Sequence, residues 1–201
     1  MLMEGDCFAH YCSICRSGKT HFCNLYPNAL DFVVMPFKYK NYAHVATCCA
    51  EGESIKAHPI LELRCDWRDL YYKALTDTYR RYPGEILVIP TDRNIMSRLE
   101  RDSIPYTVVY PNRSLKEEYY TRYLARGNTE SFLEVFIDGW DMWMDSVRNN
   151  NGSHIELQSG EFLSDVIKLP NRDFGIIENK ETYITQIIST QHIDGNSLDA
   201  I

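Results

Sequence analysis

The residues best suited to chemistry in this sequence form the stretch Ser13-Ile-Cys-Arg-Ser-Gly-Lys-Thr20. It follows the phosphate-binding pattern G-x-x-x-x-G-K-[ST], with Ser13 in place of the first glycine. In such a loop, backbone N–H groups surround phosphate oxygens, the lysine adds charge at the outer phosphates, and the Ser/Thr hydroxyl helps to hold Mg²⁺. The residues predicted to bind the phosphate-bearing ligand are Ser13, Arg16, Ser17, Gly18, Lys19, Thr20 and His21.

A phosphate-binding loop must be held between a strand and a helix. The mostly apolar run 7–12 predicts the strand, and 19–25 predicts a short helix that Pro27 ends. Hydrophobic patterns predict further strands at 28–35, 85–90, 106–111 and 154–157, and helices at 66–82, 93–102, 114–126, 129–147 and 161–169. Alternation of strands and helices predicts an α/β fold with a largely parallel sheet.

Two of these helices carry more specific signals. Ser114 and Glu117 have the spacing of a capping box that opens a helix, on which Arg122 and Arg126 would share one face. The aromatic side of 129–147 is predicted to be core.

Composition limits the function classes. The chain has 201 residues, of which 44% are hydrophobic and 24% charged, as in an ordinary globular protein. The net charge of −7 argues against broad binding to nucleic acid or to anionic membranes. Seven cysteines, an odd number, together with no signal peptide and no long apolar run, predict free thiols in a cytoplasmic protein.

Several short segments together resemble one family. These are Ser17-Gly-Lys-Thr20, Pro27-Asn-Ala-Leu-Asp31, Ile104-Pro-Tyr-Thr-Val-Val-Tyr-Pro111, Arg122-Tyr-Leu-Ala-Arg-Gly-Asn128 and Gly160-Glu-Phe-Leu-Ser-Asp165. The combination resembles phage-type P-loop nucleotide kinases, small relatives of the adenylate and deoxynucleoside monophosphate kinases. The resemblance runs from about residue 7 to residue 168.

The resemblance implies a three-layer P-loop kinase-like fold, with a mostly parallel five-stranded sheet flanked by helices. Residues 1–169 would form this domain, with an insertion or acceptor-binding segment at 41–65, a lid-like helical region at 113–128 and a C-terminal tail at 170–201. A phage-encoded chain would work in the cytosol of its bacterial host. Whether the chain forms a homodimer is left open.

The implied activity is transfer of the terminal phosphoryl group of ATP to a nucleoside or deoxynucleoside monophosphate, with Mg²⁺. Lys19 would hold the donor phosphates, Thr20 would orient the metal ion, and Asp31 would face the acceptor or the metal shell. Arg122 and Arg126 match the paired arginines of the lid, whose charge stabilises the moving phosphoryl group. Such transfer depends mainly on positioning and electrostatics.

The sequence departs from the family pattern at its first loop position and after the third strand. Ser13 replaces a glycine that permits close phosphate approach. Thr91-Asp-Arg93 and Met96 stand where the family carries serine, histidine and arginine, so Asp92 is predicted to join the metal shell and Arg93 or Arg98 to restore charge. These departures support an alternative, a P-loop-derived nucleotide-binding or partner-binding protein with impaired catalysis.

The cysteines leave a second alternative open. Cys12, Cys15, His21 and Cys23 have the ligand types and close spacing of a zinc site. Such a site would wrap residues 12 to 23 around a metal, which is incompatible with a phosphate-binding loop in the same stretch.

Overall fold

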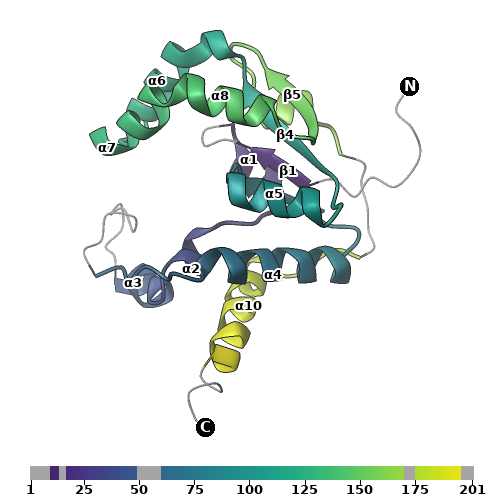
Figure 1. The fold of residues 1–201 in the computed structure, drawn as a ribbon. Coiled ribbons are helices and arrows are strands. Elements are labelled where there is room, and N and C mark those ends of the chain that lie inside the picture. Colours follow the sequence, from purple (N-terminus) through teal and green to yellow (C-terminus); the bar gives the residue numbers. More distant parts are fainter. Residues whose placement is uncertain (1–9, 14–16, 49–59, 170–174, 196–201) are drawn as a thin grey trace. The chain divides into compact units, whose positions relative to one another are not determined.

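The computed structural model describes residues 10–13, 17–48, 60–169 and 175–195. They divide into two compact units, one of residues 1–31 and 83–176, the other of residues 32–82 and 177–201. All five strands found among the described residues belong to the first unit (Figure 1).

The first unit is built on a parallel sheet. Its strands are β1 (His10–Ser13), β2 (Ala29–Asp31), β3 (Ile86–Pro90), β4 (Tyr106–Pro111) and β5 (Ser153–Leu157). They lie in the order β2-β3-β1-β4-β5, and every neighbouring pair is parallel. Short apolar runs such as Ile86–Pro90 form buried strands because parallel strands are covered on both faces.

The first unit also contains several helices. They are α1 (Lys19–Leu25), α5 (Arg93–Arg101), α6 (Lys116–Leu124), α7 (Glu130–Leu133), α8 (Trp140–Arg148) and α9 (Leu163–Val166), with a 3₁₀ helix η2 (Arg113–Leu115) and a π-helix η3 (Glu134–Asp138). One apolar cluster joins α1 and α9 to the sheet, and it consists of Phe22, Ala29, Val88, Val109, Leu157, Leu163 and Ile167.

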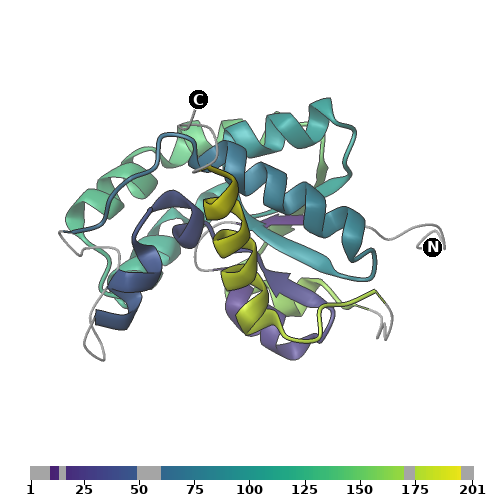
Figure 2. The same cartoon turned by 90° about the horizontal axis from the view of Figure 1, so that it is seen from below.

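The second unit is helical. It contains α2 (Met35–Lys38), α3 (Tyr42–Cys48), α4 (Trp67–Arg81) and α10 (Lys180–Gly195). The Tyr71 hydroxyl donates to the carbonyl of Phe32 at 2.7 Å, and the Thr78 and Tyr183 hydroxyls share a 3.0 Å hydrogen bond between α4 and α10. Figure 2 shows α10, which packs against α2 and α4.

The expected three-layer P-loop kinase-like fold is corrected by these findings. The class is α/β, but helix α4, expected to flank the sheet, belongs to the second unit. The described sheet is parallel throughout rather than mostly parallel. Residues 14–16, at the centre of the expected loop, lie outside the described residues. The P-loop fold is therefore not shown.

Several predicted boundaries were wrong. The strand expected at 28–35 pairs only through Ala29–Asp31, and Met35–Lys38 is a helix with Pro36 in its first turn, where the missing N–H costs nothing. Within the segment 41–65, Tyr42–Cys48 is helical, Tyr39 bridges Leu63, and residues 49–59 lie outside the described part.

The capping box predicted at Ser114 was also wrong. Asn112 takes that place, because its side-chain oxygen accepts from the amide and the hydroxyl of Ser114 at 2.9 and 2.7 Å. The helix that follows, α6, ends at Leu124.

The long helix predicted over 129–147 is interrupted by η3 and Gly139. A Cβ on Gly139 would lie 2.6 Å from the Val135 carbonyl oxygen, so the π-turn requires glycine here. Its aromatic side is only partly core, since Trp140 is buried whereas Val135 is exposed.

Gly139→Ala is expected to lower the free energy of unfolding by about 1–3 kcal/mol, since backbone must move to admit the methyl group. Urea unfolding followed by circular dichroism measures this change. Asp138→Ala, at an exposed neighbouring position, serves as the control and should change stability by less than about 0.5 kcal/mol. Equal unfolding midpoints for the two variants would show that the π-turn tolerates a side chain.

Candidate functional site

The strand order defines where a ligand would meet the sheet. Central strand β1 pairs with both β3 and β4, and Ser13 at its end lies opposite Pro90 and Val109. The chain runs from β1 outward to β2, returns to β3 between them, and then places β4 and β5 on the other side of β1, so the strand order reverses beside β1. Open α/β sheets bind ligands at the carboxyl ends of strands at such a point.

The segment after β1 enters α1 through a glycine in the left-handed region. Gly18 has φ 83° and ψ 27°, which a residue with a side chain rarely adopts. Ser17 before it is fully buried, and its carbonyl accepts from the Leu163 amide at 2.8 Å. Lys19 and Thr20 are therefore the first two residues of α1, at the carboxyl end of β1.

Two of the predicted site residues are joined directly. The Thr20 hydroxyl donates to Oδ2 of Asp31 at 2.9 Å, which links the first turn of α1 to the end of β2. A hydroxyl and a carboxylate are hard oxygen ligands of the kind that Mg²⁺ prefers. The pair fits a magnesium shell completed by water and phosphate oxygens.

Arg122 is held in a defined position. Its Nη2 donates to Oε1 of Glu118 at 2.5 Å, and its guanidinium carbon lies 4.9 Å from the ring centre of Tyr119 and 4.4 Å from that of Phe162. The side chain is only 14% exposed. Burial raises the pKa of the neighbouring Tyr119 to about 12, so that hydroxyl stays protonated.

Phe162 connects this arginine to the start of α1. A Cβ placed on Gly18 would lie 3.4 Å from Cβ and Cδ1 of Phe162. The ring that carries the Arg122 guanidinium is thus packed on the left-handed glycine before Lys19. Gly18 and Arg122, about a hundred positions apart in the sequence, therefore lie against the same side chain.

Arg126 differs from Arg122. Helix α6 ends at Leu124, so Arg126 lies in the turn that follows rather than on a shared helix face. Its side chain is exposed. The structure therefore brings one of the two predicted arginines to the start of α1.

Asp92 has a structural task. It is the N-cap of α5, and its Oδ1 accepts from the amides of Asn94 and Ile95 at 3.0 and 3.2 Å. Arg93 beside it donates through Nε to the Ser146 hydroxyl at 3.1 Å. Within the described ranges there is no group of three or more His, Cys, Asp or Glu residues that could hold a metal ion.

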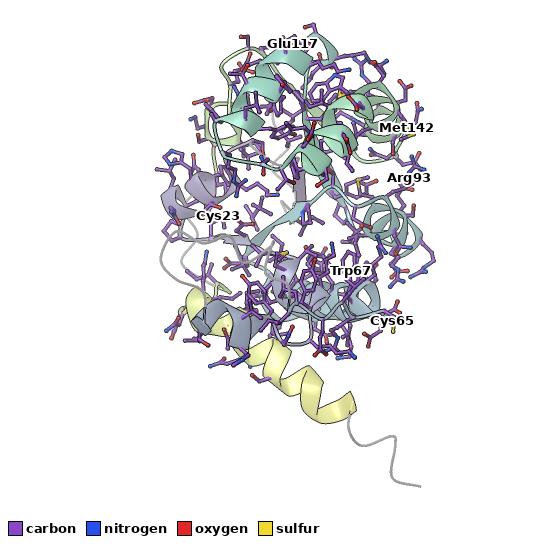
Figure 3. All side chains as sticks on the ribbon, turned by 90° about the vertical axis from the view of Figure 1, so that its left-hand side faces the viewer. Cys23, Cys65, Trp67, Arg93, Glu117 and Met142 are labelled. Carbon is purple, nitrogen blue, oxygen red and sulfur yellow. The ribbon has the colours of Figure 1, made fainter. Side chains whose placement is uncertain are left out.

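A groove of about 680 Å³ lies between α5 and α8. Arg93 and Met142 contribute to it and are labelled in Figure 3. Among the described residues, those predicted for the phosphate-binding loop do not line it, whereas Arg93, predicted to restore charge, does.

The remaining predicted residues are placed as follows. Arg16 lies outside the described residues, and only the backbone of Ser13 is described. His21 is exposed on α1, whereas Cys23 packs against the apolar cluster under that helix. Two residues apart on a helix, these side chains point in different directions, which argues against a shared zinc ion.

Three residues of this region were missed by the sequence analysis. Glu118 and Phe162 contact Arg122, and Ser159 donates to Glu118, but these residues were given no role. Glu118 stands four positions before Arg122, a spacing that predicts an ion pair on a helix. No local pattern indicates that residues 159–162 contact α6, because that contact is made through the fold.

A comparison with models of protein families found no match, and a search of curated proteins found no significant relative. None of the helices in the described ranges is long and apolar enough to cross a membrane. The functional argument therefore rests on the geometry.

Proposed function

We propose that this protein is a nucleotide kinase that transfers the terminal phosphoryl group of ATP to a nucleoside or deoxynucleoside monophosphate with Mg²⁺. The observation that carries the proposal is the packing of Phe162 between Gly18 and the Arg122 guanidinium. It connects Gly18, which precedes Lys19, with a predicted lid arginine, and phosphoryl transfer needs concentrated positive charge.

In this proposal each residue has one task. Lys19 at the start of α1 neutralises the outer donor phosphates, and Arg122 stabilises charge as the phosphoryl group moves. Thr20 and Asp31 would hold the metal ion, whose charge offsets that of the phosphate oxygens. Asp92 is committed to capping α5, so its proposed place in the metal shell is secondary.

Calorimetric titration with ATP and Mg²⁺, followed by a phosphoryl-transfer screen over the nucleoside monophosphates, tests the proposal. We expect saturable ATP binding and turnover on at least one acceptor. Absence of ATP binding by the folded wild-type protein would overturn it.

Two observations favour a second function, a nucleotide-binding protein with impaired catalysis. Arg126 is exposed beyond the end of α6, and Asp92 caps α5, so neither residue takes the role in phosphoryl transfer that the sequence predicts for it. ATP binding without turnover on any monophosphate would support this function instead.

Asp31→Asn is expected to raise the Mg²⁺ concentration needed for half-maximal activity by about tenfold. The amide oxygen can still accept from the Thr20 hydroxyl, so the first turn of α1 keeps its anchor while the negative charge is lost. Initial rates over a Mg²⁺ series measure the effect. Asp138→Asn, an exposed carboxylate, is the matched control, and an unshifted Mg²⁺ dependence in Asp31→Asn would exclude Asp31 from the metal shell.

A further inference from the structure

The Glu118 carboxylate ties helix α6 to the loop that follows β5. Its Oε1 accepts from Nη2 of Arg122 at 2.5 Å and from the Gly160 amide at 3.1 Å, and its Oε2 accepts from the Ser159 hydroxyl at 2.8 Å. The Ser159 hydrogen bond, more than any other contact, lowers the pKa of Glu118 from its ordinary value. The side chain is therefore ionised at neutral pH.

The same loop carries Phe162, whose ring lies against both Gly18 and the Arg122 guanidinium. The Glu118 carboxylate thus orients the Arg122 guanidinium directly. Through its hydrogen bonds to Ser159 and Gly160, it also holds the loop that carries the Phe162 ring. A free arginine side chain has many rotamers, and fixing it in advance removes part of the entropic cost of placing it on a ligand.

The arrangement also leaves one donor of the arginine unused. Nη1 of Arg122 is buried and has no hydrogen-bond partner among the described residues. Because Nη1 is enclosed, a phosphate oxygen could accept from it only after the side chains that cover it move, while Nη2 stays bound to Glu118. The ion pair and the ligand contact are then compatible rather than competing.

We propose that Glu118 is a positioning residue that holds Arg122 for phosphoryl transfer. The inference rests on the proposed kinase function. A displacement of about 1 Å in a reacting group can cost about a hundredfold in rate, so the effect of Glu118 should fall on kcat. Because Arg122 acts when charge moves, KM should change much less.

A double-mutant cycle tests this role, using Glu118→Gln, Arg122→Ala, the two combined, and Glu117→Gln as control. Glu117 is the exposed neighbour on the same helix (Figure 3). Glu118→Gln is expected to lower kcat by about 10- to 100-fold, with KM changed less than about threefold. In the Arg122→Ala background it should lower kcat no further, because residues that act as a unit are not additive. The Glu117 variant should match the wild type.

An equal loss of kcat in both backgrounds would overturn the proposal, since Glu118 would then act without Arg122. An unchanged kcat in Glu118→Gln would overturn it as well. If Glu118→Gln does not fold, Ser159→Ala takes its place in the cycle, where a loss of kcat that requires Arg122 supports the proposal and an independent loss overturns it. A wild-type protein that binds no ATP overturns the kinase function itself, whereas turnover with an additive cycle overturns only the role of Glu118.

Discussion

Lys19→Ala is expected to lower kcat/KM for phosphoryl transfer by about a thousandfold, the size of effect seen when a preorganised charge at transferring phosphates is removed. Lys19 follows the left-handed Gly18 directly and is the first residue of α1, at the carboxyl end of central strand β1. Alanine is favourable in a helix, so the variant should fold normally. Coupled-enzyme rates and ATP calorimetry on the same preparation measure the loss.

The control for this variant is Asn24→Ala, an exposed change on the same helix. It should leave ATP affinity and rate unchanged. If Lys19→Ala kept the wild-type affinity and rate, the donor phosphates would have to bind away from the start of α1. A loss of affinity in a protein that never turns over would assign Lys19 to the binding function alone.

Two strands of the sheet were predictable from the sequence because they are short apolar runs with clear ends. Tyr106–Pro111 and Ile86–Pro90 are bounded by turn residues and buried on both faces, so periodicity and length identify them. Helix α1 was likewise predicted at its observed bounds, since Pro27 stops it soon after Leu25.

The secondary-structure predictions were wrong where long-range contacts or backbone geometry decide the local structure. Val33 and Val34 favour a strand by propensity, yet only Ala29–Asp31 finds a pairing partner in β3. The helix predicted over 129–147 contains a π-turn that depends on Gly139, which helical periodicity does not reveal.

In the candidate site, too, local sequence patterns predicted some features, whereas those set by long-range contacts were missed. Sequence spacing identified Lys19, Thr20 and Asp31, and the fold joins the last two by one hydrogen bond. The spacing also predicted that Arg122 and Arg126 share a helix face. This was wrong, because helix α6 ends at Leu124 and residues four apart share a face only within a helix. The contacts of Arg122 with Phe162, and of Glu118 with Ser159, connect segments about forty residues apart, and no local pattern predicts them.

Arg122→Ala is expected to lower kcat by about 10²- to 10³-fold, because it removes a largely covered cation that lies on the Phe162 ring, which in turn packs on Gly18 before α1. Lys116→Ala removes a positive charge from the same helix without touching this cluster and should leave kcat within about twofold. Steady-state rates at saturating ATP measure both. Equal rates for the two variants would exclude Arg122 from the reaction.

Arg122→Lys separates charge from geometry. Lysine keeps the positive charge, but a single ammonium lacks the planar fork that can donate to Glu118 and to a phosphate oxygen at fixed angles. It also lacks the flat surface that stacks on Phe162. We therefore expect lysine to recover less than about tenfold of the activity lost in Arg122→Ala. Full recovery would mean that Arg122 acts only through its charge, and that the rings and the Glu118 ion pair serve the fold rather than the reaction.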